Sequence, residues 1–379
     1  MTCSNETAFK AYSRSGNNDK PPFGCFAIDS DTASKVLGRP TYWRAKAKCQ
    51  IAFWEGRRDE VVESWKADAI ELYDKLDCFD ILSLCTSMAG LCPPKGYAPK
   101  PPRKIDDDTW EDAEGRIFRY SPITDDISLV SDPMLWQRQY KVEDYEKLTP
   151  EVPDESIFEV VDALIAHFRG KRFILGTYGL VEGWFLPGSM ERGFMEIAER
   201  PQEVSRIYSL LCKKAMAEDK YYIRDGQDGV LLGTDFSSSQ GPMINPQTYK
   251  DIFYQSYKDR IANLKANNQI VIQHACGNNH KFMDILTTIG ADCYQSIQPS
   301  AGMDIIELHK QYGNKISLWG GIAVETLING TPQEIRAQVD RFMEYAKGKT
   351  GLILGTSHSI AVGTKYDNFM ALLDQYSKY

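Results

Sequence analysis

The sequence has no apolar run as long as the roughly 18 to 20 residues that a membrane-spanning helix requires. Its first residues also lack the basic stretch and apolar core of a secretory signal. Basic residues are not in excess, because 44 lysines and arginines are set against 52 acidic residues, for a formal net charge of −8. Such a balance does not favour nucleic acid or an anionic membrane as a partner. The sequence therefore predicts a cytoplasmic protein that binds small molecules and other proteins.

Two further patterns are missing. The nine cysteines are odd in number and have no framework spacing, which favours reduced thiols over disulfides in a chain of this length. The glycine pattern of a dinucleotide-binding fold is absent, which weakens the case for an open doubly wound sheet. The chain does have 42% apolar residues, enough for one large α/β domain or two smaller ones.

The second half of the chain alternates short apolar runs with amphipathic helical segments. Continuous apolar runs are typical of parallel strands that are covered on both faces. Six such runs occupy 172–179, 229–236, 269–277, 292–299, 315–322 and 351–359, and two earlier candidates occupy 80–85 and 116–120. About eight strand and helix units favour an α/β fold of the (β/α)8 TIM barrel type over an open sheet.

The first part of the chain is less regular. Residues 1 to about 37 are polar and are predicted to form a loosely ordered extension. A helix is expected at about 59–76, and the run 92–104 is a loop because its prolines lack a donor and fix φ. In a barrel, a loop after the first strand lies over the mouth. We therefore predict an N-terminal extension and lead-in at 1–58 and one barrel domain at 59–379.

A pair of residues at a strand end is the first candidate for chemistry. His274 and Cys276 are two positions apart, so both side chains point to one face if the strand stays regular. Imidazole and thiolate are ligands that zinc prefers, and a catalytic zinc site uses three protein ligands. The alternative is that one residue packs inside the barrel while the other bonds a backbone carbonyl. His358, at the end of the last strand, could be the third ligand, cap a helix or bind an anionic substrate.

Other polar or aromatic residues lie where predicted strands end, which is where a barrel gathers its active site. Asp235 and Glu182 are candidates for a base, a ligand or a substrate contact, although Asp235 could simply bond the serine-rich turn after it. Tyr178 is the third catalytic candidate. The candidates for substrate binding are Ser87, Trp184 and Gln298.

Four blocks in order resemble the uroporphyrinogen decarboxylase superfamily. They are GTDFSSSQGPMINP, VIQHACGN, ISLWGGIAVETLINGTPQEI and GLILGTSHSIAVGT, and an earlier block, GWFLPGSMERGFMEIAERPQEV, is similar too. The resemblance covers roughly residue 59 to the C-terminus. It implies a single (β/α)8 barrel with one of two chemistries: cofactor-free decarboxylation of a porphyrinogen, or zinc-dependent methyl transfer to or from a corrinoid carried by a partner protein.

The residues favour the methyltransferase branch of this superfamily. Its decarboxylases carry an RQAGR-type segment and an aspartate after the first strand, whereas this chain has RPTYWRAKAKCQIAFWEG at 39–56 and Ser87, or a neighbour, at the aspartate's place. A hydroxyl cannot supply the charge of a carboxylate. The methyltransferases carry a His-x-Cys pair, which His274 and Cys276 match, and a third ligand that is usually cysteine, where this chain has His358.

The resemblance thus implies a zinc-dependent methyltransferase similar to the methyltransferase I component of O-demethylases. We expect transfer from an aryl methyl ether to the cobalt(I) of a corrinoid protein, since His358 departs from the all-thiolate pattern of thiol-activating relatives. The expectation also rests on the aromatic residues Tyr42, Trp43, Phe53, Trp54, Trp184 and Phe185. The alternatives are a tetrapyrrole decarboxylase, a methyl-corrinoid:thiol methyltransferase and a tetrapyrrole-binding protein without activity.

Overall fold

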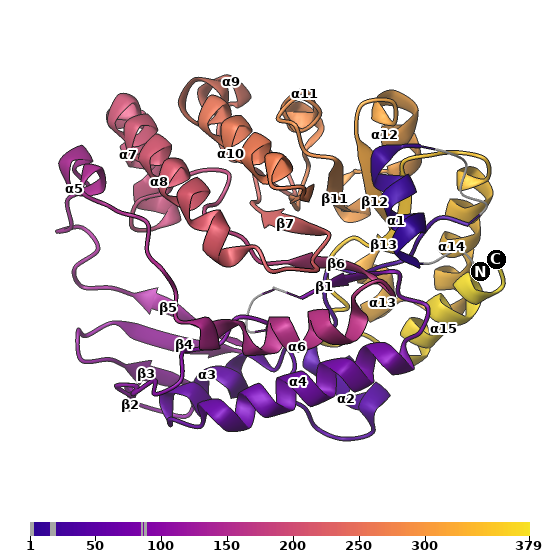
Figure 1. Cartoon of the computed structure of the whole chain (residues 1–379), viewed down its shortest axis with the longest axis horizontal. Coiled ribbons are helices and arrows are strands. Elements are labelled where there is room, and N and C mark those ends of the chain that lie inside the picture. Colours follow the sequence, from indigo (N-terminus) through magenta and orange to yellow (C-terminus); the bar gives the residue numbers. More distant parts are fainter. Residues whose placement is uncertain (1–3, 16–19, 85, 87–88) are drawn as a thin grey trace.

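A curled parallel sheet forms the centre of the protein in a computed structural model that describes residues 4–15, 20–84, 86 and 89–379 (Figure 1). Within these ranges, seven strands pair side by side in the order β1-β6-β7-β10-β11-β12-β13, and all their pairings are parallel. They are β1 (Ile81–Ser83), β6 (Phe173–Gly176), β7 (Gly229–Gly233), β10 (Ile270–His274), β11 (Cys293–Ile297), β12 (Ser317–Ile322) and β13 (Leu352–Thr356). Each lies inside a run that the sequence predicted as a strand.

The eighth position of the barrel wall is filled by a short segment from the N-terminal part of the chain. Phe23 bridges Leu354 of β13, and Gly24 bridges Ile81 of β1, both in parallel. The amide of Gly24 donates to the carbonyl of Leu354 at 3.1 Å, and the amide of Asp80 donates to the carbonyl of Phe23 at 2.8 Å. These bonds close the ring, so the protein has the α/β barrel fold that the sequence predicted.

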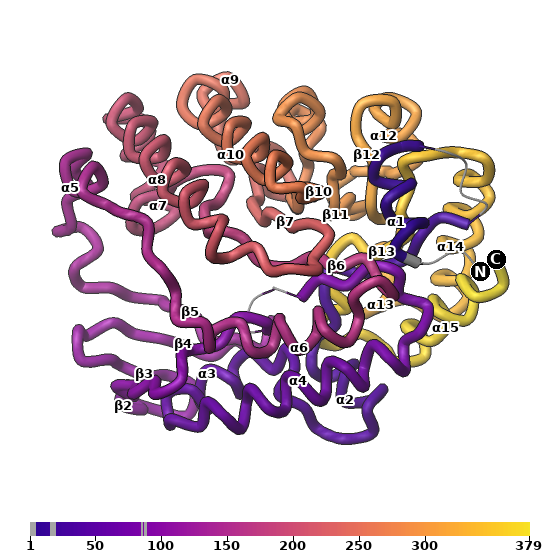
Figure 2. The backbone as a smooth tube through the Cα atoms, viewed as in Figure 1, coloured from indigo at the N-terminus to yellow at the C-terminus, as the bar shows by residue number. Residues whose placement is uncertain are grey.

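The prediction that residues 1 to about 37 are loosely ordered was wrong for the described part of this segment. Its described residues include α1 (Ser4–Ser13) and α2 (Ser30–Leu37). Helix α1 contacts β1, β6, β12 and β13, and its residues Ala8, Ala11 and Tyr12 belong to a buried cluster that joins side chains of all seven strands. Figure 2 shows this indigo segment beside the yellow C-terminal part of the chain. Part of the predicted extension therefore covers one end of the barrel, while the division at residue 58 stays a prediction.

An antiparallel sheet follows β1 and lies outside the barrel. It consists of β2 (Arg103–Lys104), β3 (Thr109–Glu111), β4 (Ile117–Ser121) and β5 (Asp126–Ser131), paired in that order. Strand β4 contains the run 116–120, so the prediction that this run is a barrel strand was wrong. Its side chains are at most half-buried, whereas β1 and β6 are buried throughout. The proline-rich run 92–104 contains no helix, as predicted.

Helices cover the outside of the barrel (Figure 1). The remaining α-helices are α3 (Lys46–Trp54), α4 (Arg58–Lys75), α5 (Val142–Glu146), α6 (Glu159–Phe168), α7 (Met190–Glu199), α8 (Pro201–Tyr222), α9 (Pro246–Tyr249), α10 (Gln255–Ala266), α11 (Met283–Leu286), α12 (Ile305–Tyr312), α13 (Val324–Asn329), α14 (Pro332–Ala346) and α15 (Tyr366–Ser377). The minor elements are η1 (Glu155–Phe158), η2 (Lys250–Tyr254), η3 (His280–Phe282), η4 (Pro299–Ala301), β8 (Ser237–Ser238) and β9 (Gly241–Pro242). Among the described residues, no helix combines the length and the apolar character needed to cross a bilayer.

Candidate metal centre

Two strand ends bring together the three residues that the sequence proposed as ligands. Strand β10 ends at His274, two residues before Cys276, and β13 ends two residues before His358. The ligating atoms of the three residues lie within 4.8 Å of one another, and Cys276 Sγ is 3.3 Å from His274 Nε2. Because β11 and β12 separate these two strands in the sheet, only the curvature of the barrel can make them converge.

The surroundings of His274 suit a metal ligand. Its Nδ1 is hydrogen-bonded to Oε1 of Gln295, an amide oxygen that can only accept, so the proton sits on Nδ1 and the lone pair sits on Nε2. The ring stacks on Phe26 with 4.5 Å between centroids. Burial lowers the pKa of His274, which keeps the imidazole neutral, as metal ligation requires.

His358 is held in a similar environment. Its Nδ1 lies 3.0 Å from Oγ of Ser359, which leaves Nε2 available, and its ring is 5.6 Å from that of Phe26 and 5.8 Å from that of His274. Burial, and then the neighbouring His274, lower the pKa of His358 to about 4. Both imidazoles are therefore neutral near pH 7.

The thiol of Cys276 is protonated when no metal is bound. Burial, and then the Asp235 carboxylate, raise the pKa of Cys276 to about 12. Its Sγ lies 2.9 Å from Oγ of Ser296, which in turn donates to the carbonyl of Ser357 at 2.5 Å. The backbone amide of Cys276 donates to Oδ1 of Asp235 at 2.6 Å. A metal bound here would therefore displace one proton from the sulfur.

The turn after Cys276 is held by side-chain amides. Gly277 has φ of +87°, and its amide donates to Oε1 of Gln298 at 3.0 Å. Gln298 also donates to Glu325, and Nδ2 of Asn279 donates to the carbonyl of Cys276 at 2.9 Å. Gln298 thus fixes the metal-centre turn in this structure, and its predicted contact with substrate stays a prediction.

The residues fit zinc. In a tetrahedral zinc site, metal–ligand bonds of about 2.0 to 2.3 Å place the ligand atoms about 3.3 to 3.8 Å apart. The 3.3 Å between Cys276 Sγ and His274 Nε2 already meets that spacing, and the three-residue set needs only a small contraction. One thiolate and two imidazoles are nitrogen and sulfur donors of the kind that zinc takes, and three protein ligands leave a fourth position for substrate.

A pocket of about 380 Å³ reaches His274 from the mouth of the barrel, and three sequence candidates line it: Glu182, Trp184 and Asp235. Gly233, at the end of β7, also lines it, and a side chain added there would meet no atom within 4 Å. Burial, and then the charge of Asp235, raise the pKa of Glu182. The pocket therefore combines a carboxyl group that holds its proton unusually well with a neutral imidazole.

Other sequence candidates lie elsewhere. Tyr178 does not line this pocket, and its hydroxyl donates to the carbonyl of Leu231 at 3.1 Å. Ser87 lies outside the described residues. The aromatic residues Tyr42, Trp43 and Phe53 are buried in the core cluster. Of the aromatic set that motivated an aryl substrate, Trp184 and Phe185 line the two described pockets of the mouth.

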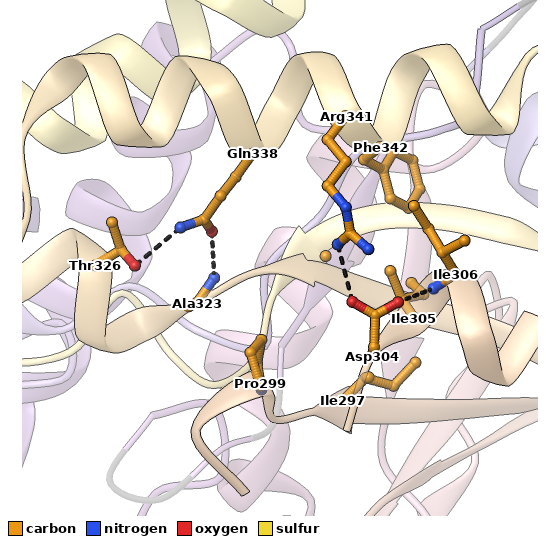
Figure 3. Close-up of a pocket in the computed structure, with 11 residues that line it drawn as sticks. Ile297, Pro299, Asp304, Ile305, Ile306, Ala323, Thr326, Gln338, Arg341 and Phe342 are labelled. Atoms are coloured by element: carbon orange, nitrogen blue, oxygen red, sulfur yellow. Dashed lines mark hydrogen bonds and ion pairs between the residues drawn. The ribbon is translucent and has the colours of Figure 1, made fainter. Parts of the chain in front are cut away.

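A second pocket, of about 300 Å³, lies between α12, α13 and α14 (Figure 3). Its polar groups bond one another. Arg341 pairs with Asp304 at 2.9 Å, while Gln338 accepts from the amide of Ala323 and donates to Thr326, both at 2.9 Å. Because these groups are already paired, the pocket does not compete with the mouth pocket as a reaction site.

Sequence reasoning assigned no role to the residues that support the ligands. Phe26, Gln295 and Ser296 all contact the metal centre. Gln295 and Ser296 were visible only as part of a strand end, and Phe26 lay in a segment predicted to be loosely ordered. No spacing rule marks them, because they reach the site through the closure of the barrel and a bulge in β11.

Comparisons with known proteins agree with this architecture. A family model described as "Uroporphyrinogen decarboxylase (URO-D)" matches residues 185–379, just over half of the chain. A uroporphyrinogen decarboxylase of Vesicomyosocius okutanii subsp. Calyptogena okutanii (strain HA) is 22% identical over 208 residues, which are 55% of this chain and 57% of that protein. The match thus spans little more than half the length of this curated relative. A solved structure of a methyltransferase from Methanosarcina mazei is similar in fold, with a TM-score of 0.68 and 14% identity over 100% of this chain and 99% of that one.

Proposed function

Because this chain belongs to the uroporphyrinogen decarboxylase family, we propose that it is a zinc-dependent methyltransferase. In this proposal a methyl group passes from a methylated small molecule to the cobalt(I) corrinoid of a partner protein. The observation that carries it is the convergence of His274, Cys276 and His358 at the mouth of the barrel. A metal-free decarboxylase has no need of such a ligand set. The similar fold of a protein described as a methyltransferase supports the same choice.

The metal centre would activate the donor. His274, Cys276 and His358 would hold zinc, which supplies a Lewis acid that polarises the bond between the methyl group and its leaving atom. Gln295 fixes the tautomer of His274, and Asp235 fixes the turn at Cys276 by accepting from its amide. These bonds keep two of the three ligands in place before substrate arrives.

Glu182 is the proposed proton donor. When a methyl ether loses its methyl group, the bond from carbon to oxygen breaks and the oxygen keeps the electron pair, so it gains from a proton. The raised pKa of Glu182 keeps its carboxyl group protonated at a higher pH than an ordinary glutamate. Asp235 assists through its negative charge, which contributes to that raised pKa. Tyr178 stays a candidate without a defined step.

An aryl methyl ether is the proposed donor. Trp184, Leu186, Met190 and Met243 form apolar parts of the pocket lining. Such a wall suits a flat apolar ring, which gains from being removed from water. The two other activities considered for the chain, tetrapyrrole decarboxylation and methyl transfer from a corrinoid to a thiol, are outcomes of the following test.

The test is a methyl-transfer assay with purified, zinc-loaded protein, a cobalt(I) corrinoid protein and guaiacol. We expect the absorbance of methyl-cobalt to appear and to be lost when a chelator removes the metal. Release of carbon dioxide from a porphyrinogen by the metal-free protein would instead show a decarboxylase. Transfer only from methyl-corrinoid to a thiol would reverse the direction proposed here, and absence of transfer from any methyl donor would refute the proposal.

A further inference from the structure

The mouth pocket is acidic. Glu182 and Asp235 both line it, and among its described lining residues there is no lysine or arginine. Within the described part of the chain, neither carboxylate takes part in an ion pair. Asp235 accepts from the backbone amide of Cys276 and is hydrogen-bonded to its thiol, and both bonds leave its charge in place.

The charge of Asp235 acts on a pocket of about 380 Å³. Asp235 lines this pocket beside Glu182 and accepts from the amide of Cys276, so its charge faces both the pocket and the candidate metal centre. Four other lining residues are apolar and cannot screen it: Trp184, Leu186, Met190 and Met243. A third pocket, of about 290 Å³, shares Glu182, Trp184 and Leu186 with the mouth pocket and adds four apolar residues. A ligand that extends into it finds no basic residue among the described lining either.

A buried cation that acts on the candidate metal centre is already paired. Arg44 acts electrostatically on His358, but its guanidinium bonds Asp29 at 2.7 Å, and both side chains are only 4% exposed. Zinc held by one thiolate and two neutral imidazoles would leave one net positive charge, which the Asp235 carboxylate alone balances while Glu182 holds its proton. An anionic group in this pocket would therefore lose its water and meet no net positive charge.

We propose that the site takes uncharged or cationic methyl donors and rejects donors that carry a carboxylate, sulfonate or phosphate group, with Asp235 and Glu182 as the residues that determine this specificity. The inference rests on the proposed function for the reaction itself. It adds a property of the substrate that aromatic lining alone does not define. Repulsion by unpaired like charge is a common way to exclude a competing ligand without losing affinity for the accepted one.

Three compounds of nearly equal shape test the proposal: 3-methoxybenzylamine, 3-methoxytoluene and 3-methoxybenzoate, which are cationic, neutral and anionic at pH 7. Their binding to the zinc-loaded protein is measured by titration calorimetry without any corrinoid. We expect the benzoate to bind at least about tenfold more weakly than the toluene, since one unit of like charge at close range in a protein site is worth that much or more. The amine should bind at least as well as the toluene.

The double variant Asp235→Asn, Glu182→Gln leaves neither side chain able to carry a negative charge and keeps both carbonyl oxygens as acceptors. We expect it to bring the three affinities within about threefold of one another, the range left by shape and desolvation alone. Asp284→Asn, which removes an exposed carboxylate of α11, should leave the order unchanged. A benzoate that binds as well as the toluene to the unmodified protein would contradict this inference and leave the aryl donor standing. Binding of none of the three would contradict the aryl donor, and this inference with it.

Discussion

Ser296 adopts a backbone conformation that is costly for a residue with a side chain. Its φ is +78°, and it lies at a bulge of β11 between Gln295 and Ile297. The bulge directs its hydroxyl to Cys276 Sγ at 2.9 Å and to the carbonyl of Ser357. Strain of this kind persists where the surrounding structure holds it, often at functional sites. We therefore expect Ser296 to position the sulfur of the metal centre.

Two substitutions distinguish the effect of the Ser296 hydroxyl from the effect of its strained backbone. Ser296→Ala removes the hydroxyl and keeps the strained backbone, whereas Ser296→Gly removes both. Both variants should bind zinc at least about tenfold more weakly, as loss of a supporting hydrogen bond does in metal sites. In the metal-free state the glycine variant should unfold with a free energy about 1 kcal/mol higher than that of the alanine variant. Competition with a chromophoric chelator and urea unfolding measure the two effects, and an alanine variant with undiminished zinc affinity would disprove the role.

The pH dependence of the reaction should report on Glu182. The proton donor must be protonated to act, so kcat/KM for an aryl ether should fall as the pH rises through the pKa of Glu182, which lies above the ordinary value. Glu182→Gln should lose this limb of the profile and lower kcat by about 10² to 10⁴. Phenyltrimethylammonium, whose leaving group is a neutral amine and needs no proton, is the control. If Glu182→Gln leaves the pH profile for the ether unchanged, Glu182 is not the proton donor.

At this scale the sequence indicated the residues proposed as metal ligands better than those that support them. His274, Cys276 and His358 could be predicted because their residue types and their places at strand ends are both informative. Phe26 and Ser296 could not, because a stacking phenyl ring and a strained serine have no characteristic spacing. Ser87 lies outside the described residues, and its predicted contact with substrate stays a prediction.

Helix α1 packs against the barrel although it lies outside the regular alternation of strands and helices. Its residues Ala8, Ala11 and Tyr12 are buried against the interior side chains of the barrel, and the Tyr12 ring lies 4.8 Å from that of Phe173. The helix is polar and short, so neither its composition nor its length predicts that it covers the barrel. The strand position at Phe23 and Gly24 was missed for a similar reason, since two bridges are too few to give a period.

Substitutions of Tyr12 test whether α1 stabilises the barrel. Its side chain is 1% exposed, and its hydroxyl has no hydrogen-bond partner among the described residues. Tyr12→Ala should lower the free energy of unfolding by about 3 to 5 kcal/mol, because it removes a buried ring. Tyr12→Phe should leave it unchanged or raise it slightly, since it removes only an unpaired buried hydroxyl. Urea unfolding measures both, and an alanine variant as stable as the parent would show that α1 is dispensable.

The run 116–120 shows the limit of strand prediction at the level of elements. It does form a strand, β4, but β4 pairs with β3 and β5 in an antiparallel sheet outside the barrel. Local β-propensity shows that a segment can be extended and does not show which partner it takes. A helix start depends on local sequence alone, as at α14, where Thr331 and Glu334 form the reciprocal bonds of a capping box.

The molecule as a whole follows the architecture that its apolar runs predicted. Seven continuous apolar runs became seven parallel barrel strands, because only strands covered on both faces have that pattern. The barrel then explains how His274 and His358, 84 positions apart in the sequence, converge at one site. The closure of the ring by an N-terminal segment could not be predicted, since it depends on the complete wall being formed.

The central claim is that His274, Cys276 and His358 form a zinc site. Its most direct test is the metal content of the purified protein by mass spectrometry, beside that of His358→Ala and, as a control, His280→Ala. His280 bonds the carbonyl of Gly302 and lies outside the ligand set. We predict about one zinc per chain in the parent and in His280→Ala, and less than about a tenth of that in His358→Ala, because two ligands alone hold zinc weakly. A parent protein that binds no zinc, or a His358→Ala variant that keeps it, would contradict the account.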